Sequence, residues 1–161
     1  MKRATNPIAS LPLLGKILAG VLAWEGAWWA RRRLKRGAVY NDALRQSIAT
    51  GKPLIVVGAP DAGVTSGYGC GHLTVDLIPR SSCPRFLRAD ISRPLPFPDD
   101  SCVVFVSCVL EYVERFREAY DEIRRIAGPN LYIIRVEPWT LAAYVYPGAQ
   151  RTLPASLPGV R

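Results

Sequence analysis

The chain has 161 residues, which is enough for one domain of ordinary size, and 49% of them are hydrophobic. This composition excludes intrinsic disorder as the default, because disordered chains are poor in apolar residues. The formal net charge of +8 arises almost entirely from residues 1–37, which hold eight Lys or Arg and one Glu. No aromatic stacking platform is interleaved with these basic residues, so we expect an anionic lipid surface rather than specific nucleic acid as their partner.

Residues 8–36 combine an apolar run, Ile8–Ala30, with a basic cluster at residues 31–36. The run is as long as a helix that crosses a bilayer, and three Trp residues precede the cluster, as where a helix leaves lipid. A lysine, a glutamate and two prolines in or beside the run disfavour spanning. An in-plane helix or a helix docked on a partner protein therefore remain alternatives. A cleaved signal peptide is disfavoured because no small-residue cleavage site is present.

We predict three regions: a membrane-associated hydrophobic helix with a basic flank (1–37), a globular domain (38–153) and an irregular tail (154–161). If the first helix spans, its basic carboxyl flank places the globular part in the cytoplasm, at the membrane. In that domain, helical periodicity and glycine stops predict helices at 39–50 and 114–127, and a short helix is expected at 139–146. Apolar, β-branched runs predict strands at 53–58, 73–78, 85–90, 102–108 and 130–137.

The alternation of strands with crossover connections indicates an α/β fold with a reduced, Rossmann-like, mostly parallel sheet. The connections at residues 59–72 and 79–84 are short or rich in glycine, so part of the sheet lacks covering helices. We therefore expect a protein partner, or a second copy of the chain, to cover the incomplete sheet.

The four cysteines form no C-x-x-C pair, and Cys102 and Cys108 flank an apolar strand, which favours a reduced environment. His72 is the only histidine, and a zinc site needs about four suitably spaced ligands. We therefore predict no metal site.

The segment Leu95–Glu111 (LPFPDDSCVVFVSCVLE) joins a proline-framed acidic turn to a buried strand and a carboxylate. It resembles the "LPFPD-S-D-V-x-S-x-x-L-E-H" signature of class I S-adenosylmethionine-dependent methyltransferases of the type 11 group. The resemblance extends, with gaps, from about Lys52 to about Leu153. It implies a Rossmann-like fold, S-adenosylmethionine as cofactor, and binding at the carboxyl ends of the strands.

The resemblance also implies roles for individual residues. Gly58 stands at the first glycine of the cofactor-binding turn, although Pro60 replaces the second glycine and the motif is degraded. Asp76 matches the acceptor for the ribose hydroxyls, with a surface carboxylate as the alternative. Asp90 and Ile91 match the adenine site, with a turn-initiating Asp as the alternative.

Two further residues, Ser107 and Glu111, lie at the carboxyl end of the strand at 102–108 and just after it, where the family places groups near the transferred methyl. Glu111 is the candidate catalytic residue, although a charge at the start of the following helix is the simpler role. Residues 136–140 are expected on the substrate side.

Two functions follow from the resemblance. The first is a membrane-associated methyltransferase. The second is a non-catalytic methyltransferase-like module that serves as a structural or anchoring subunit, because Pro60 disrupts the glycine motif and fold does not imply activity.

Overall fold

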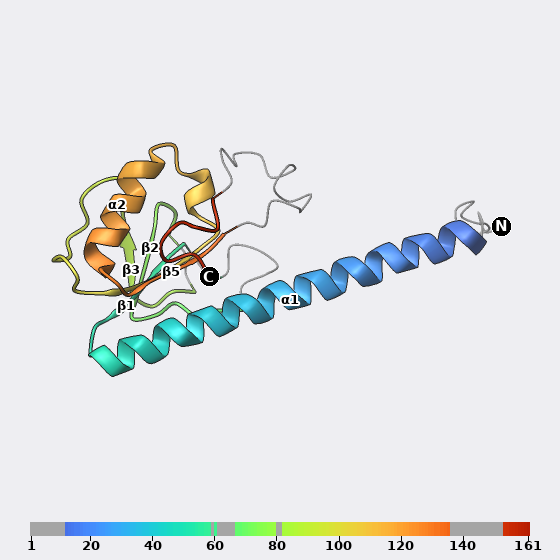
Figure 1. The fold of residues 1–161 in the computed structure, drawn as a ribbon, viewed down its shortest axis with the longest axis horizontal. Coiled ribbons are helices and arrows are strands. Elements are labelled where there is room, and N and C mark those ends of the chain that lie inside the picture. The colour runs from blue at the N-terminus through green and yellow to red at the C-terminus, as the bar shows by residue number, and fades with distance from the viewer. Residues whose placement is uncertain (1–11, 59, 61–66, 80–81, 136–152) are drawn as a thin grey trace, which may run out of the picture.

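The computed structural model describes residues 12–58, 60, 67–79, 82–135 and 153–161. In this part of the chain, five parallel strands form one sheet in the order β3-β2-β1-β4-β5. Their bounds are β1 Leu54–Val57, β2 Leu73–Asp76, β3 Phe86–Arg88, β4 Val103–Ser107 and β5 Leu131–Ile134. Helices α1 (Pro12–Thr50) and α2 (Phe116–Ala127) lie on opposite faces of the sheet (Figure 1). The predicted Rossmann-like α/β fold is confirmed.

The central strands β1 and β4 are apolar runs because all of their residues are buried, and helices contact both faces of β4. Successive side chains of β4 alternate between two cores. Val104 and Val106 pack with α2, whereas Val103 and Phe105 pack with α1. The side-chain period of two residues therefore decides which layer each position of β4 reaches.

Helix α1 joins two segments that the sequence predicted as separate helices. It runs without interruption through residues 37 and 38, and Val39 and Ala43 pack against the sheet. The amino-terminal half of α1 extends well beyond the globular body (Figure 1). The helix stops at Gly51, whose φ of +67° suits a glycine after a helix end, as predicted.

The basic cluster at residues 31–36 is divided between solvent and the protein interior. Arg32 and Arg36 are buried, because positions four residues apart share the helix face that carries Val39 and Ala43. Arg31, Arg33 and Lys35 are exposed. Within the described residues, no helix is both long enough and apolar enough to cross a bilayer, so the transmembrane-helix prediction is not supported.

The two faces of the sheet are not covered equally along its width. Helix α1 contacts β1, β4 and β5, and α2 contacts β4 and β5. Strand β3 at the far edge is less buried, and Leu77 and Ile78 after β2 are each 58% exposed. Helices thus cover β4, and no partner is needed there. That a partner covers the β2–β3 side of the sheet stays a prediction.

Residues 154–161 were predicted as an irregular tail, and they form no helix or extended strand. They nevertheless dock on the protein, since Val160 forms an isolated parallel bridge with Ile133 of β5. Leu153 is buried in the α2-side core, and the Tyr120 hydroxyl donates to the carbonyl of Pro158. This segment thereby covers part of the β5 edge.

The proline-framed turn before β4 is held by Arg125 of α2. Its guanidinium donates to the carbonyls of Leu95 and Phe97 and to the carboxylates of Asp99 and Glu122. Glu122 also accepts the backbone N–H of Leu95 at 2.6 Å. This network fixes the entry of the chain into β4.

Acid should weaken this network. The hydrogen bond from Arg125 lowers the pKa of Glu122 below its usual value of 4.5. A carboxyl group whose pKa is lowered in the folded state stabilises the fold at pH values above its unfolded-state pKa. This stabilisation is lost as the pH falls through the folded-state pKa. We expect the melting temperature to drop below about pH 4.5, and Glu122→Gln to flatten this drop, as measured by circular dichroism. Glu118→Gln, an exposed change on the same helix, should leave the profile unchanged; equal profiles for all three proteins would contradict the assignment.

Candidate functional site at the carboxyl ends of the strands

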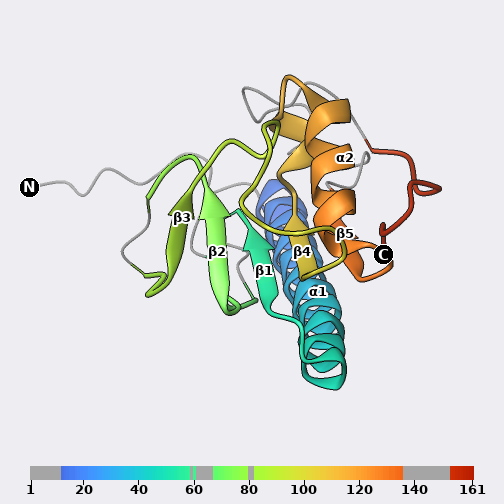
Figure 2. The same cartoon turned by 90° about the vertical axis from the view of Figure 1, so that its left-hand side faces the viewer.

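A pocket of about 430 Å³ opens at the carboxyl ends of β1, β2 and β3. It lies beside the point where the strand order reverses, since β1 pairs with β2 on one side and with β4 on the other. Open parallel sheets bind ligands at such a switch point. Figure 2 shows the strands pointing toward this end of the sheet. The pocket is lined by Val57, Gly58, Val75, Asp76, Leu77, Ala89, Asp90, Ile91, Ser92, Val109, Tyr112, Val113, Glu114 and Arg115.

Four of the six predicted site residues meet in this pocket: Gly58, Asp76, Asp90 and Ile91. Gly58 directly follows β1, Asp76 ends β2, and Asp90 and Ile91 lie two and three residues after β3. Parallel strands bring their carboxyl ends to one edge of the sheet, so these residues meet there. Asp76 ends β2, and its Oδ1 accepts the backbone N–H of Ile78 at 3.2 Å, which orients the carboxylate.

Gly58 follows β1 with a φ of +87°, a conformation that L side chains rarely adopt. A Cβ at this position would lie 2.5 Å from Cγ2 of Val109. The backbone of the turn therefore packs directly on the segment after β4. Pro60 is buried, whereas residues 59 and 61–66 of the glycine-rich loop lie outside the described part of the chain.

Asp90 has a structural role in addition to its place in the pocket wall. Its Oδ1 accepts the N–H and the hydroxyl of Ser92, at 2.9 and 2.7 Å, so it does initiate a turn. These bonds, aided by Arg115 and Arg93, hold the pKa of Asp90 below its usual range. The carboxylate therefore stays ionised beside the largely buried Ile91.

Ser107 lies on the opposite face of the sheet from the pocket. It occupies the same side of β4 as Val103 and Phe105, which pack with α1. There it neighbours Tyr68, whose pKa is raised to about 12 by burial although a hydrogen bond with Ser107 opposes the rise. Ser107 is not among the residues that line the pocket.

Glu111 lies in a short 3-10 helix, η2 (Leu110–Tyr112), with only 1% of its surface exposed. It too is absent from the pocket lining. The pocket therefore includes the two predicted aspartates but not the predicted glutamate. Residues 136–140, predicted on the substrate side, lie outside the described residues.

The pocket wall also holds Ser92, which follows Asp90 and Ile91, and three polar residues between β4 and α2 that were not predicted: Tyr112, Glu114 and Arg115. They lie in the segment between β4 and α2, which also holds Glu111. The turn of η2 decides which members of this segment face the pocket. With Asp76, Asp90 and Glu114 against Arg115, carboxylates outnumber guanidinium groups, which favours a cationic or hydrogen-bond-donating ligand.

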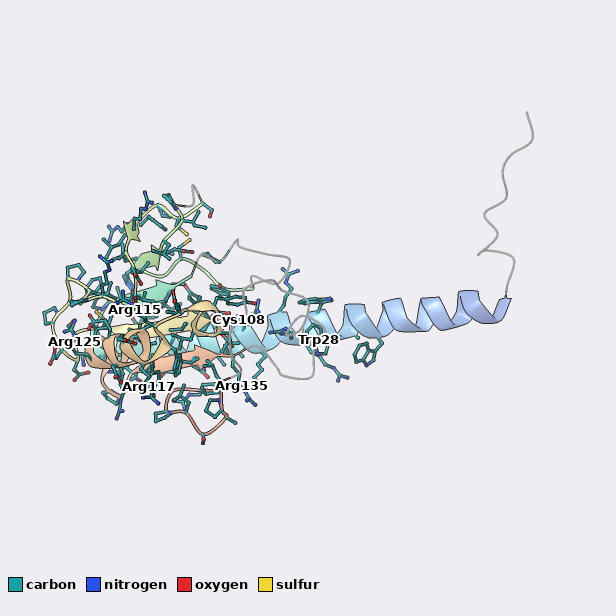
Figure 3. All side chains as sticks on the ribbon, turned by 90° about the horizontal axis from the view of Figure 1, so that it is seen from above. Trp28, Cys108, Arg115, Arg117, Arg125 and Arg135 are labelled. Atoms are coloured by element: carbon teal, nitrogen blue, oxygen red, sulfur yellow. The ribbon has the colours of Figure 1, made fainter. Side chains whose placement is uncertain are left out.

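On the other face, buried arginines of α1 meet the residue after β4. The guanidinium of Arg36 donates to Sγ of Cys108 at 3.0 Å, and Arg32 approaches it at 3.6 Å while lying over the ring of Trp28. Cys108 lies against α1 (Figure 3) and has a φ of +53°. Burial raises the pKa of its thiol, and Arg36 opposes this.

His72 has a structural contact, since its Nδ1 accepts the backbone N–H of Leu54 at 3.0 Å. Within the described residues, no group of three or more His, Cys, Asp or Glu is placed to hold a metal ion.

The structure is an α/β domain with a pocket beside the switch point of a parallel sheet. Residues 67–134 match the family model described as "Methyltransferase domain". The strand order and this match identify a class I S-adenosylmethionine-dependent methyltransferase-like domain in the chain. No curated protein and no solved structure matches the chain.

Proposed function

We propose that the pocket beside β1 and β2 binds S-adenosylmethionine and that the domain is a methyltransferase. The observation that carries this proposal is that Gly58, Asp76, Asp90 and Ile91 line one pocket. Its volume of about 430 Å³ lies within the roughly 300–1,000 Å³ that small-molecule sites occupy.

The residues in the pocket fit the nucleoside part of this cofactor. The Asp76 carboxylate is an acceptor only, which suits two ribose hydroxyls as donors. Ile91, with Ala89 and Val113, supplies an apolar wall for a flat ring. Oδ1 of Asp90 already accepts two hydrogen bonds from Ser92, so an exocyclic amine would approach Oδ2.

Bound S-adenosylmethionine would supply an electrophilic methyl group on a sulfonium. The chain's task is then to align an acceptor with that group and to exclude water, for which position matters more than a dedicated base. Tyr112, Glu114 and Arg115 form the pocket wall after β4 and are placed to orient an acceptor. Glu111 is too buried to reach one without rearrangement.

Calorimetry with S-adenosylmethionine, and with its demethylated product, tests binding on the full chain. We expect a saturable heat and a rise in melting temperature with ligand concentration, because a ligand that binds only the folded state stabilises it. The absence of both at millimolar ligand would overturn the proposal.

The second candidate is a non-catalytic methyltransferase-like module that serves as a structural or anchoring subunit. It is favoured by Pro60, which lacks a backbone donor and cannot provide the close approach of a glycine. Cofactor binding without methyl transfer to any protein, lipid or small-molecule fraction would favour this function over the enzyme.

For α1 we propose an in-plane contact with an anionic lipid surface. Trp24 and Leu34 are 69% and 74% exposed, and Arg31, Arg33 and Lys35 are exposed beside them. Apolar and aromatic groups flanked by basic ones suit the interface of a charged bilayer. The amino-terminal half of α1 projects away from the body, which leaves it accessible (Figure 1).

Vesicle co-sedimentation checks this contact. We expect binding to vesicles that contain phosphatidylserine and little binding to phosphatidylcholine alone. The triple change Arg31→Gln, Arg33→Gln and Lys35→Gln should weaken binding about 100-fold, since each basic residue near such a surface contributes about 1 kcal/mol. Arg45→Gln, an exposed change farther along α1, should have little effect. Equal binding to both vesicle types would refute the proposal.

A further inference from the structure

Cys70 and Cys83 lie together at the amino-terminal edge of the sheet, opposite to the pocket. Cys70 precedes β2 and Cys83 precedes β3, and these strands pair in parallel with Thr74 beside Phe86. The parallel register brings the two lead-in segments side by side. Their Sγ atoms are 2.7 Å apart.

This separation is shorter than the roughly 3.5–4.0 Å at which non-bonded heavy atoms pack best. It exceeds the disulfide bond length of about 2.05 Å. Both cysteines are present as free thiols in the structure. The two sulfurs are thus already closer than packing alone favours, and a small movement would bring them to bonding distance.

The backbone around the pair is anchored on both sides. The Thr74 hydroxyl donates to the carbonyl of Cys70 at 3.0 Å, and the Cys70 thiol lies 3.6 Å from the carbonyl of Ser82. The other two cysteines have different neighbours. Cys102 contacts the Ser101 hydroxyl, and Cys108 contacts the arginines of α1.

We propose that Cys70 and Cys83 form a reversible disulfide. The oxidant is a small disulfide such as oxidised glutathione. The thiolate of Cys70, the more exposed of the two, attacks one of its sulfurs and releases the first glutathione thiolate. The Cys83 thiolate then attacks Sγ of Cys70 and releases the second, and the two protons from the protein thiols end on the two glutathiones.

The bond would close a loop that contains all of β2. That loop includes Asp76, the proposed ribose acceptor at the opposite end of the strand. Cross-linking restricts the unfolded chain, so the oxidised protein should be more stable than the reduced one. The bond would also fix the base of β2 to the base of β3 without entering the pocket.

Peptide mass spectrometry tests the proposal on the full chain. The protein is equilibrated with mixtures of reduced and oxidised glutathione, quenched with acid, alkylated under denaturing conditions and digested with trypsin without reduction. Cleavage after Arg80 places the two cysteines in different peptides, whereas Cys102 and Cys108 share residues 89–115. We expect one linked species that joins the peptide ending at Arg80 to Ser81–Arg85, and an intact mass lower by two hydrogens.

Cys70→Ser and Cys83→Ser should each abolish the link, and Cys102→Ala should retain it. The melting temperature of the oxidised wild-type protein should fall by several degrees on reduction, while that of Cys70→Ser should not change. Four alkylated cysteines at every glutathione ratio, or a link to Cys102 or Cys108, would overturn the proposal. The outcome is independent of cofactor binding.

Discussion

Replacing Asp76 with Ala should weaken S-adenosylmethionine binding at least about 100-fold. Hydrogen bonds to a charged group contribute about 1.5–3 kcal/mol each, and the carboxylate is placed to accept two of them. A loss of about 3 kcal/mol in binding free energy raises Kd about 100-fold. Calorimetry on the variant and on the wild-type protein measures this ratio directly.

The matched control for this change is Asp121→Ala, which removes a carboxylate from the exposed side of α2. It should leave Kd unchanged. The hydrogen bond from Ile78 to Asp76 is lost in the variant, so its circular dichroism spectrum and melting temperature are recorded to show that it folds. A folded Asp76→Ala protein with wild-type affinity would remove Asp76 from the site.

Gly58→Ala should both destabilise the protein and close part of the pocket. The new Cβ meets Cγ2 of Val109 at 2.5 Å, and the residue would have to keep a φ of +87°. Backbone strain of this kind costs about 1–3 kcal/mol, and overpacking costs a similar amount. We therefore expect a loss of about 3 kcal/mol in the free energy of unfolding, measured by urea denaturation.

Two further variants separate the clash from the strain. Gly51→Ala places alanine at a φ of +67° with nothing within 4 Å of its Cβ, so it should show the strain alone. Adding Val109→Ala to Gly58→Ala removes the clashing methyl group. In a double-mutant cycle, the double variant should therefore lose about 1 kcal/mol or more less unfolding free energy than the sum of the two single losses. Additive effects of the two changes would show that the predicted contact between Gly58 and Val109 is absent.

Much of the fold could be predicted because the signals are local. The β-branched runs at Leu54–Val57 and Val103–Ser107 and the glycine stops at Gly51 and Gly128 act over a few residues. Helix α1 was divided in two because its periodicity changes along the chain. Its first half projects from the body, whereas its second half packs on the sheet.

The candidate site could be predicted only in part. Asp76 and Asp90 were predicted because they match cofactor-binding positions of the family that the sequence resembles. These positions lie near strand ends, where the topology of a parallel sheet brings side chains together. Glu111 satisfies the same rule but is buried in η2, and Tyr112, Glu114 and Arg115 face the pocket instead. The geometry of a single turn decides this, and the residue types around it do not reveal it.

Propensity and turn chemistry operate between near neighbours, so the sequence alone predicts the strands in their order along the chain and the helix ends before Gly51 and Gly128. Tertiary structure decided which face received Ser107, that Arg32 and Arg36 turn inward, and that Cys70 meets Cys83. These outcomes depend on the docking of α1 and on the register of β2 and β3. Both are set by contacts between segments far apart in the chain, which no local pattern encodes.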